Sequence, residues 1–316
     1  VTVPAGFKIA KDTGLTVQQG VVIEDVNAST DSAVQGSQFV WIPVGKFTKD
    51  DGTESNEIIL GRYTFADDAQ GTPTLQQAAY TDENPENYKN SKVIEELYDE
   101  YSGPHRDGVP NSIYGINATA NDLGAWIESV KENGGYYIGR YEASYATGSN
   151  LENFKAATKV STGYRTETDG SMSYTEGTLW NWITQLGASK AAINTYKDSE
   201  SVKSDLMNSY AWDTTIVYIQ ECGKANYANQ DGESINSNLT NTGTGQDEVC
   251  KINDMASNIR EWTTEYSSNT DYAAHVYPST SRGGVYNYIY DYMAYRGNGT
   301  SYYTDESVGF RLSLYM

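Results

Sequence analysis

The apolar residues of this chain follow a strand-like period in some segments and a helix-like period in others, without regular alternation between the two. β-Branched and aromatic residues between turn-forming residues predict strands at 20–23, 38–44, 57–63 and 136–143. Apolar residues at helical spacing predict helices at 93–101, 121–133, 178–187 and 204–223. Because a parallel sheet requires alternating strands and helices, we expect an α+β fold with short strands, a few helices and much irregular loop.

Capping residues set the expected ends of two of these helices. Asn121 is a good N-cap for the helix that ends at Asn133, where two glycines follow. The last helix is the best defined, because Ser204 or Asp205 can cap its N-terminus and Gly223 follows its final turn.

Neither an internal repeat nor a convincing boundary divides the chain, so we expect a single domain over residues 1–316. Residues 1–37 form a strand-containing lead-in, and the polar, less regular residues 66–120 are interpreted as a surface insertion. Residues 249–316 combine short strand patterns with long irregular segments, and they contain a Tyr-rich segment at 285–303. A chain of this length can bury a large core, so its stability requires neither disulfides nor metals.

The charge of the chain excludes two classes of partner. The sequence has 22 Lys and Arg against 42 Asp and Glu, a net charge of −20. Binding to nucleic acid or to an anionic membrane surface depends on basic residues, so we expect neither. No apolar run approaches the roughly 20 residues of a membrane span. No signal-like segment begins at Val1, so we expect any export signal or anchor to have been removed or to lie outside this sequence. The high negative charge favours a monomer.

The two cysteines, Cys222 and Cys250, lie 28 positions apart, a spacing that matches no metal motif. In an exported protein they can form a disulfide, which the chain-entropy model values at about 3–4 kcal/mol. In the cytosol they would be two buried thiols. The composition, with few Lys and many Asn, Ser, Thr, Gly and Tyr, favours an extracellular protein and therefore the disulfide.

Few residues suggest catalysis or metal binding. His105 and His275 are isolated in turn-rich or loop segments, and such histidines are most often solvated. The acidic pairs Asp67/Asp68 and Glu95/Glu96 are neighbours in sequence, whereas acid–base catalysis requires carboxylates that face each other. No nucleophile elbow, phosphate-binding glycine loop, dinucleotide fingerprint or zinc-binding helix is present. We therefore expect no catalytic residue and no metal site.

Several motifs near the C-terminus occur in the order found in one known family. They are Asn253-Asp254-Met255-Ala256-Ser257-Asn258-Ile259-Arg260-Glu261-Trp262-Thr263, then Ser281-Arg282-Gly283-Gly284, then Val308-Gly309-Phe310-Arg311-Leu312. Together they resemble the formylglycine-generating-enzyme-like branch of the C-type lectin fold. The runs at 39–45, 137–142 and 208–213 resemble earlier elements of that family. The resemblance spans residues 38–316, with 66–120 unmatched.

The resemblance implies roles for some residues and argues against others. Glu261 is expected to accept bonds from loop N–H groups, and Arg282 and Arg311 to donate to carbonyls. Members of the family sometimes bind calcium at positions that correspond to Asn258 and Glu261. Ser257 and Arg260 depart from the family pattern, which weakens the expectation of calcium, and we expect no other cofactor.

Two kinds of enzyme have the resembled fold, and each requires side chains that this chain lacks. The oxidising members need a cysteine pair in the segment that corresponds to 285–308, and this segment contains no cysteine. The iron-dependent sulfoxide synthases need a histidine cluster, which two scattered histidines cannot supply. An enzyme of either kind is therefore the least favoured of three hypotheses.

The segment 285–303 has seven tyrosines in nineteen residues. One interpretation is a Tyr-rich strand that faces the core. The other is that it resembles the variable region of diversity-generating-retroelement proteins, which display mutable residues on a C-type lectin scaffold as antibodies do on theirs. We then expect ligand contacts from Val285, Tyr286, Asn287, Tyr288, Tyr290, Asp291, Tyr292, Asn298, Tyr302 and Tyr303. Residues 293–296 are expected to be fixed framework.

The leading hypothesis is a non-catalytic ligand-binding protein, either a receptor-binding protein or an adhesin, on a bacterial surface or a phage particle. The alternative is an undiversified structural or adhesive domain of the same fold. Tyrosine-rich binding surfaces favour a protein target over a glycan. An adenine-containing repeat beside a reverse-transcriptase gene would separate the first two hypotheses.

Overall fold

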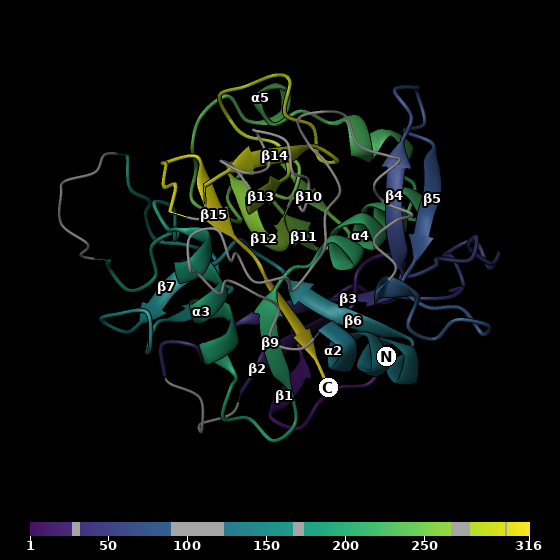
Figure 1. Ribbon diagram of the computed structural model, residues 1–316, viewed down its shortest axis with the longest axis horizontal. Coiled ribbons are helices and arrows are strands. Elements are labelled where there is room, and N and C mark those ends of the chain that lie inside the picture. Colours follow the sequence, from purple (N-terminus) through teal and green to yellow (C-terminus); the bar gives the residue numbers. More distant parts are fainter. Residues whose placement is uncertain (27–31, 90–122, 167–173, 267–278, 301) are drawn as a thin grey trace.

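The computed structural model describes residues 1–26, 32–89, 123–166, 174–266, 279–300 and 302–316 (Figure 1). Over these residues the fold is α+β, with a few helices and several small sheets joined by irregular segments, as the sequence predicts. Among the helices so described, none combines the length and the apolar character that a membrane crossing requires.

The largest sheet contains six strands in the order β1-β2-β3-β6-β16-β9. The strands are β1 (Phe7–Ile9), β2 (Val22–Asp25), β3 (Gln38–Pro43), β6 (Gly135–Gly139), β16 (Leu312–Tyr315) and β9 (Lys203–Leu206). Every neighbouring pair in it is antiparallel. The C-terminal strand therefore lies inside the sheet, between two strands from the middle of the chain.

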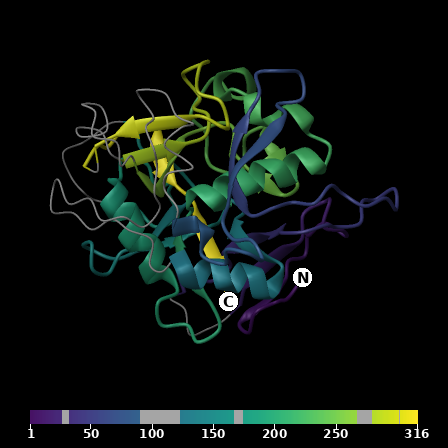
Figure 2. The same ribbon diagram turned by 45° about the vertical axis from the view of Figure 1, so that its right-hand side comes forward.

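A second sheet of four strands has the order β14-β13-β12-β15. Its strands are β14 (Arg296–Gly299), β13 (Ser279–Arg282), β12 (Arg260–Tyr266) and β15 (Val308–Phe310). β12 and β15 are parallel, and the other two pairs are antiparallel. Only Arg311 separates β15 from β16, so one stretch of chain links both sheets. Figures 1 and 2 both show the four-stranded sheet on the opposite side of the molecule from helix α2 (Leu123–Asn133).

Three strand pairs complete the β structure of the described residues. They are β4 (Gly61–Phe65) with β5 (Pro73–Ala78), β7 (Ser144–Thr147) with β8 (Lys155–Ala157), and β10 (Glu248–Val249) with β11 (Ile252–Asn253). β5 falls within the predicted insertion and pairs with β4, while residues 90–120 of that insertion lie outside the described residues.

In the part of the chain that the structure describes, the helices besides α2 are α3 (Gln185–Thr195), α4 (Ser209–Glu221) and the single-turn α5 (Gly232–Ile235), with 3₁₀ turns η1 (Asn87–Lys89) and η2 (Ala225–Asn229). Asn208 caps α4, because its side chain accepts a hydrogen bond from the Ala211 amide. Residues 209–219 of α4 are buried on all sides, so this helix runs through the core and not over the surface.

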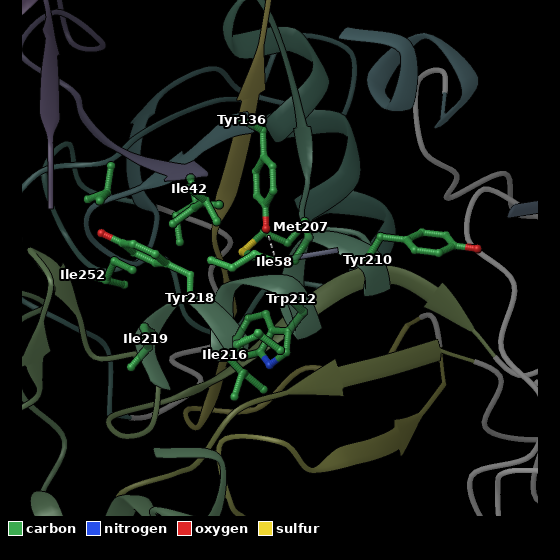
Figure 3. Packing of buried hydrophobic residues seen from close by; sticks show 14 of the residues in the cluster. Ile42, Ile58, Tyr136, Met207, Tyr210, Trp212, Ile216, Tyr218, Ile219 and Ile252 are labelled. Atoms are coloured by element: carbon green, nitrogen blue, oxygen red, sulfur yellow. Dashed lines mark hydrogen bonds between the residues drawn. The ribbon is translucent and has the colours of Figure 1, made fainter. Parts of the chain in front are cut away.

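The six-stranded sheet is buried on both faces because successive side chains of a strand point in opposite directions. In β3, Val40 and Ile42 pack toward α4, while Phe39 and Trp41 pack into the cluster that contains α3. Figure 3 shows the first cluster, where Ile42 and Tyr136 from the sheet meet Trp212 and Ile216 of α4. The Tyr136 hydroxyl donates to the Ala211 carbonyl at 2.7 Å.

The helix predicted at 178–187 is wrong. α3 begins only at Gln185, with Thr184 as its N-cap. Leu179, Trp180 and Ile183 are buried outside any helix, and Trp182 has a φ of 59°. Their helix-like spacing arises from a loop that packs its side chains into the core, a pattern that sequence periodicity cannot distinguish from a helix.

The predicted start of the next helix is also wrong. Ser204 and Asp205 lie in β9 and not at a helix cap, because they pair with Leu314 and Ser313 of β16. The strand predicted at 57–63 begins only at Gly61, and the one predicted at 136–143 ends at Gly139. The predictions for 20–23 and 38–44 are confirmed as β2 and β3 within two residues, and α2 confirms the helix at 121–133. Asn121 and the helix predicted at 93–101 lie outside the described residues.

Candidate functional site

The Tyr-rich segment forms a loop between two paired strands. It leaves β13 after Arg282 and enters β14 at Arg296, and these two residues face each other in the antiparallel register. Between them the segment is not a strand: it contains turns and an isolated bridge between Val285 and Tyr288. The interpretation as a Tyr-rich strand facing the core is therefore wrong. We refer to residues 283–295 as the tyrosine loop.

A buried group of four charges holds the base of the tyrosine loop. Arg282 contacts Asp213 at 2.6 Å and Glu265 at 3.0 Å, and Arg296 contacts the same two carboxylates at 2.7 and 2.8 Å. The charges balance, and each guanidinium has two carboxylate partners, which offsets the cost of removing these ions from water. Arg282 also donates to the Tyr295 carbonyl at 3.0 Å, as expected for this residue.

Three buried residues anchor the tyrosine loop between its ends. Val285 is fully buried against Gly232, where an added Cβ would lie 2.6 Å from the Val285 amide nitrogen. Asp291 is 1% exposed and forms an ion pair with Arg260. Met293 is fully buried, and its carbonyl accepts a hydrogen bond from the Trp212 indole at 3.1 Å. The backbone of the loop is thus fixed at intervals along its length.

The predicted ligand contacts from Val285 and Asp291 are wrong. Both residues are buried: the backbone of Val285 packs closely against Gly232, and the carboxylate of Asp291 neutralises Arg260. Burial raises the pKa of Asp291 even though Arg260 opposes this shift. Neither contact is local in sequence, so the Tyr-rich composition gave no indication of it.

The tyrosines between these anchors face solvent. The side chains of Tyr288, Tyr290 and Tyr292 are 47%, 61% and 40% exposed. Asn287 is exposed, and so is Ile289, which the alternation of tyrosines had not suggested as a contact residue. The rings of Tyr288 and Tyr290 meet edge to face, with 5.4 Å between their centroids. This pair reduces the freedom of two large side chains that water still reaches.

Tyr295, Tyr302 and Tyr303 extend this exposed set, at 42%, 60% and 42%. Tyr295, predicted to be fixed framework, accepts a hydrogen bond from Arg282 through its carbonyl while its side chain is exposed. Tyr303 lies with its ring 6.4 Å from that of Trp262, in an edge-to-face arrangement. Asn298 lies in β14 opposite Thr280 in the register.

Residues 302–306 lie beside the tyrosine loop. Tyr286 is half-buried and its hydroxyl donates to Glu306 at 2.7 Å. Burial, reinforced by Glu306, raises the pKa of Tyr286, and Asp305 and Tyr164 add to the shift. Arg260 connects the two segments, because its amide donates to the Ser307 carbonyl while its side chain pairs with Asp291.

A third segment borders this region and was not predicted. Asn181 donates to the carbonyls of both Arg165 and Glu306, at 2.6 and 2.9 Å, and so places the irregular segment 163–165 beside residues 302–306. Tyr164 in that segment is 39% exposed. A single tyrosine between Gly163 and Arg165 carries no sequence signal. We call Tyr164, the tyrosines of the tyrosine loop, and Tyr302 and Tyr303 the tyrosine surface.

A layer of buried carboxylates surrounds Arg311, deep in the region of the family-like motifs. Glu261 bonds to Arg311 through both oxygens, at 2.7 to 3.1 Å, and does not accept from loop N–H groups as expected. Glu142 takes that role, accepting from the Ile259 amide at 3.2 Å. Arg311 donates to the carbonyls of Gly139 and Asn253, as predicted. Burial raises the pKa of Asp254 to about 6.

The side chains of Asn258 and Glu261 do not fit a calcium site. The Asn258 carbonyl oxygen accepts from the Thr240 amide at 2.9 Å, and its NH₂ group donates to Glu142 at 2.6 Å. The Glu261 carboxylate is committed to Arg311. Calcium requires several oxygens that converge on one point. Across the described residues, no group of three His, Cys, Asp or Glu side chains could hold a metal ion.

Cys222 and Cys250 are free thiols that lie next to each other. Cys222 ends α4, and Cys250 lies in the turn between β10 and β11 with a φ of 50°. A hydrogen bond between the two side chains, together with burial, raises the pKa of the Cys222 thiol. The two residues are thiols in this structure, and because they lie side by side a disulfide under oxidising conditions stays a prediction. His105, His275 and Glu95/Glu96 lie outside the described residues.

Comparison with known proteins gave distant likenesses only. No model of a known family matches the chain, and no curated protein matches it. Among solved structures, CarF is similar at 14% identity and a TM-score of 0.38, over 58% of this chain and 87% of that one. Treponema denticola variable protein 1 is similar at 12% identity and a TM-score of 0.31, over 91% and 98%. At these values neither likeness carries an argument, although the second protein's name matches the class that the motifs resemble.

Proposed function

We propose that this chain is a non-catalytic ligand-binding protein with the formylglycine-generating-enzyme-like form of the C-type lectin fold. The tyrosine surface is its binding site, and its target is a protein. In this proposal it is a variable protein of a diversity-generating retroelement, and it acts as a receptor-binding protein or adhesin on a bacterial surface or a phage particle.

One observation supports the proposal above all others: within the tyrosine loop, the anchors and the displayed residues are different side chains. Val285, Asp291 and Met293 are at most 1% exposed, while Tyr288 and Tyr290 are about half exposed. Tyrosine supplies a large, rigid contact area with only two side-chain torsions to restrict on binding. A fixed backbone that displays such side chains is suited to binding, because little conformational entropy is lost when the partner docks.

The non-catalytic part of the proposal rests on which side chains surround this surface. The segment 285–308 contains no cysteine, so the oxidising chemistry of the resembled family has no thiol there. Of the buried carboxylates nearby, Glu261 is committed to Arg311, and Glu142 to the side chain of Asn258 and the amide of Ile259.

The proposal can be tested by probing an array of extracellular proteins with the labelled chain. The double variant Tyr288→Ala/Tyr290→Ala should lose its array signals, while its melting temperature stays within about 2 °C of the parent. Leu15→Ala, which truncates a 91% exposed side chain in the N-terminal region, is the matched control and should retain all signals. Array signals that survive in the double variant would contradict the proposal.

A second candidate is an undiversified adhesive domain that binds through the same surface. It is favoured by the burial of Val285 and Asp291, because random changes at either position would disturb the loop anchors. The nucleotide sequence around the gene separates the two. The first candidate requires a near-identical repeat with adenines at the codons of Tyr288, Tyr290 and Tyr292, beside a reverse-transcriptase gene.

A further inference from the structure

Within the described part of residues 252–316, which carries most of the tyrosine surface, every arginine is engaged by a carboxylate. From Ile252 to Met316 the sequence contains no lysine and four arginines. Each arginine is paired with a carboxylate: Arg260 with Asp291, Arg282 and Arg296 with Asp213 and Glu265, and Arg311 with Glu261.

Carboxylates at the edge of the tyrosine surface remain accessible. Asp305 and Glu306 are both partly exposed. The Asp305 carboxylate accepts from Ser307 and from the Tyr303 hydroxyl, and one Glu306 oxygen accepts from the Tyr286 hydroxyl. On the other side of the loop, Asp231 forms a bridge with Tyr292 and caps α5. Among the described residues at this edge, Arg165 supplies a nearby positive charge, and its guanidinium lies over the Tyr174 ring, 5.4 Å from the centroid.

A partner that covers the tyrosine surface must also cover these carboxylates. Removing an ionised carboxylate from water without a counter-charge is costly, so a partner that supplies a cation is favoured over one that does not. The exposed rings favour the same kind of partner, because a guanidinium or ammonium group is attracted to the face of a tyrosine. The cost of burying the carboxylates and the attraction of cations to the rings both favour Arg or Lys on the partner.

We propose that the tyrosine surface binds a protein segment that carries Arg or Lys side chains, with at least one of them between the tyrosine rings and the carboxylates of Asp305 and Glu306. This inference rests on the proposed binding function and specifies the chemistry of its partner. The anionic edge determines which partners are accepted, while the tyrosines contribute the contact area.

Fluorescence anisotropy with four labelled peptides of equal length tests the proposal. The peptides alternate Gly with Arg, Lys, Gln or Glu. The Arg peptide should bind the parent protein more tightly than the Gln peptide, and the Glu peptide should not bind. Asp305→Asn/Glu306→Gln should lower the affinity for the Arg peptide by about fivefold. A rise in salt concentration should lower the peptide affinity of the parent more than that of this variant.

The matched control is Glu128→Gln/Glu132→Gln, which removes two negative charges from the exposed side of α2, far from the tyrosine surface (Figure 1). It should change the affinity for the Arg peptide by less than twofold. An equal loss in both double variants would show that the peptide responds only to the overall charge of the protein, and would overturn the proposal. The single variants Asp305→Asn and Glu306→Gln keep the test valid if the double variant does not fold.

The array experiment distinguishes failure of this inference from failure of the binding function. If Tyr288→Ala/Tyr290→Ala loses its targets while Asp305→Asn/Glu306→Gln keeps them, the surface binds without a cation and the inference is wrong. The inference is also wrong if the bound targets prove to be neutral glycans or a second copy of this chain. If neither variant affects binding, both proposals are wrong.

Discussion

Tyrosines lie in two regions of this molecule, buried in the core around α4 and exposed to solvent on the tyrosine surface. Around α4, the Tyr136 and Tyr218 rings are buried, and their hydroxyls donate to the carbonyls of Ala211 and Val17. On the tyrosine surface the rings of Tyr288 and Tyr290 contact each other and water. A tyrosine becomes a core residue when a neighbouring carbonyl satisfies its hydroxyl, and a candidate contact residue when the backbone is fixed by other side chains.

The largest effect should come from removing a core tyrosine. Tyr136→Ala leaves a large cavity beside α4 and removes the hydrogen bond to the Ala211 carbonyl, so the free energy of unfolding should fall by about 3–5 kcal/mol. Tyr290→Ala on the tyrosine surface should change it by less than about 0.5 kcal/mol. Urea unfolding of both variants measures the difference. Equal losses would mean that the two regions do not differ as described.

The buried charges under the tyrosine loop give the next largest effect. Asp213→Asn leaves Arg282 and Arg296 with only the Glu265 carboxylate, so we expect a loss of about 3 kcal/mol in unfolding free energy. The exposed Glu128→Gln should have no measurable effect. A small loss in Asp213→Asn would show that the loop does not depend on this group of charges.

A pH dependence should distinguish the buried carboxylate layer from the tyrosine surface. The pKa of Asp254 is about 6 in the folded protein against 3.8 ordinarily, so the folded state holds its proton more tightly. The stabilisation that protonated Asp254 gives the folded state is therefore greatest at low pH and is lost as the pH rises through about 6. The free energy of unfolding should fall by about 2 kcal/mol from this cause between pH 4 and pH 6. In Asp254→Asn this part of the pH dependence of the unfolding free energy should disappear. Urea unfolding at several pH values measures that dependence. An unchanged dependence in the variant would contradict the raised pKa of Asp254.

The smallest effect on stability should accompany the largest effect on binding. Tyr288→Ala/Tyr290→Ala should leave the unfolding free energy within about 1 kcal/mol of the parent, because the rings contact mainly each other and water. Differential scanning calorimetry beside the protein array measures both quantities. A large loss of stability would place these rings in the core.

The sequence predicted those helices and strands whose determinants lie within a few neighbouring residues, and failed for those determined by distant contacts. β3 and α2 were found because their apolar periods are complete within a few residues. β9 was mistaken for the start of a helix because its identity depends on pairing with β16, about a hundred positions away. The loop at 179–183 was mistaken for a helix because burial in an irregular loop can produce the same spacing.

The same distinction applies to the candidate site. The Tyr-rich composition of residues 285–303 located the exposed loop, including Tyr288, Tyr290 and Tyr302. Composition could not show that Val285 and Asp291 are anchors, because their partners, Gly232 and Arg260, come from other parts of the chain. Tyr164 was missed for the same reason, since the contacts of Asn181 bring its segment beside residues 302–306.

The position of β16 has a consequence for the order in which the protein can assemble during synthesis. β6 and β9 do not pair with each other, and residues 312–315 join them. A ribosome must therefore release nearly all of the preceding chain before the six-stranded sheet can close. Until then, the apolar side chains of β6 and β9 lack the strand that joins them, and contacts this distant in sequence form slowly.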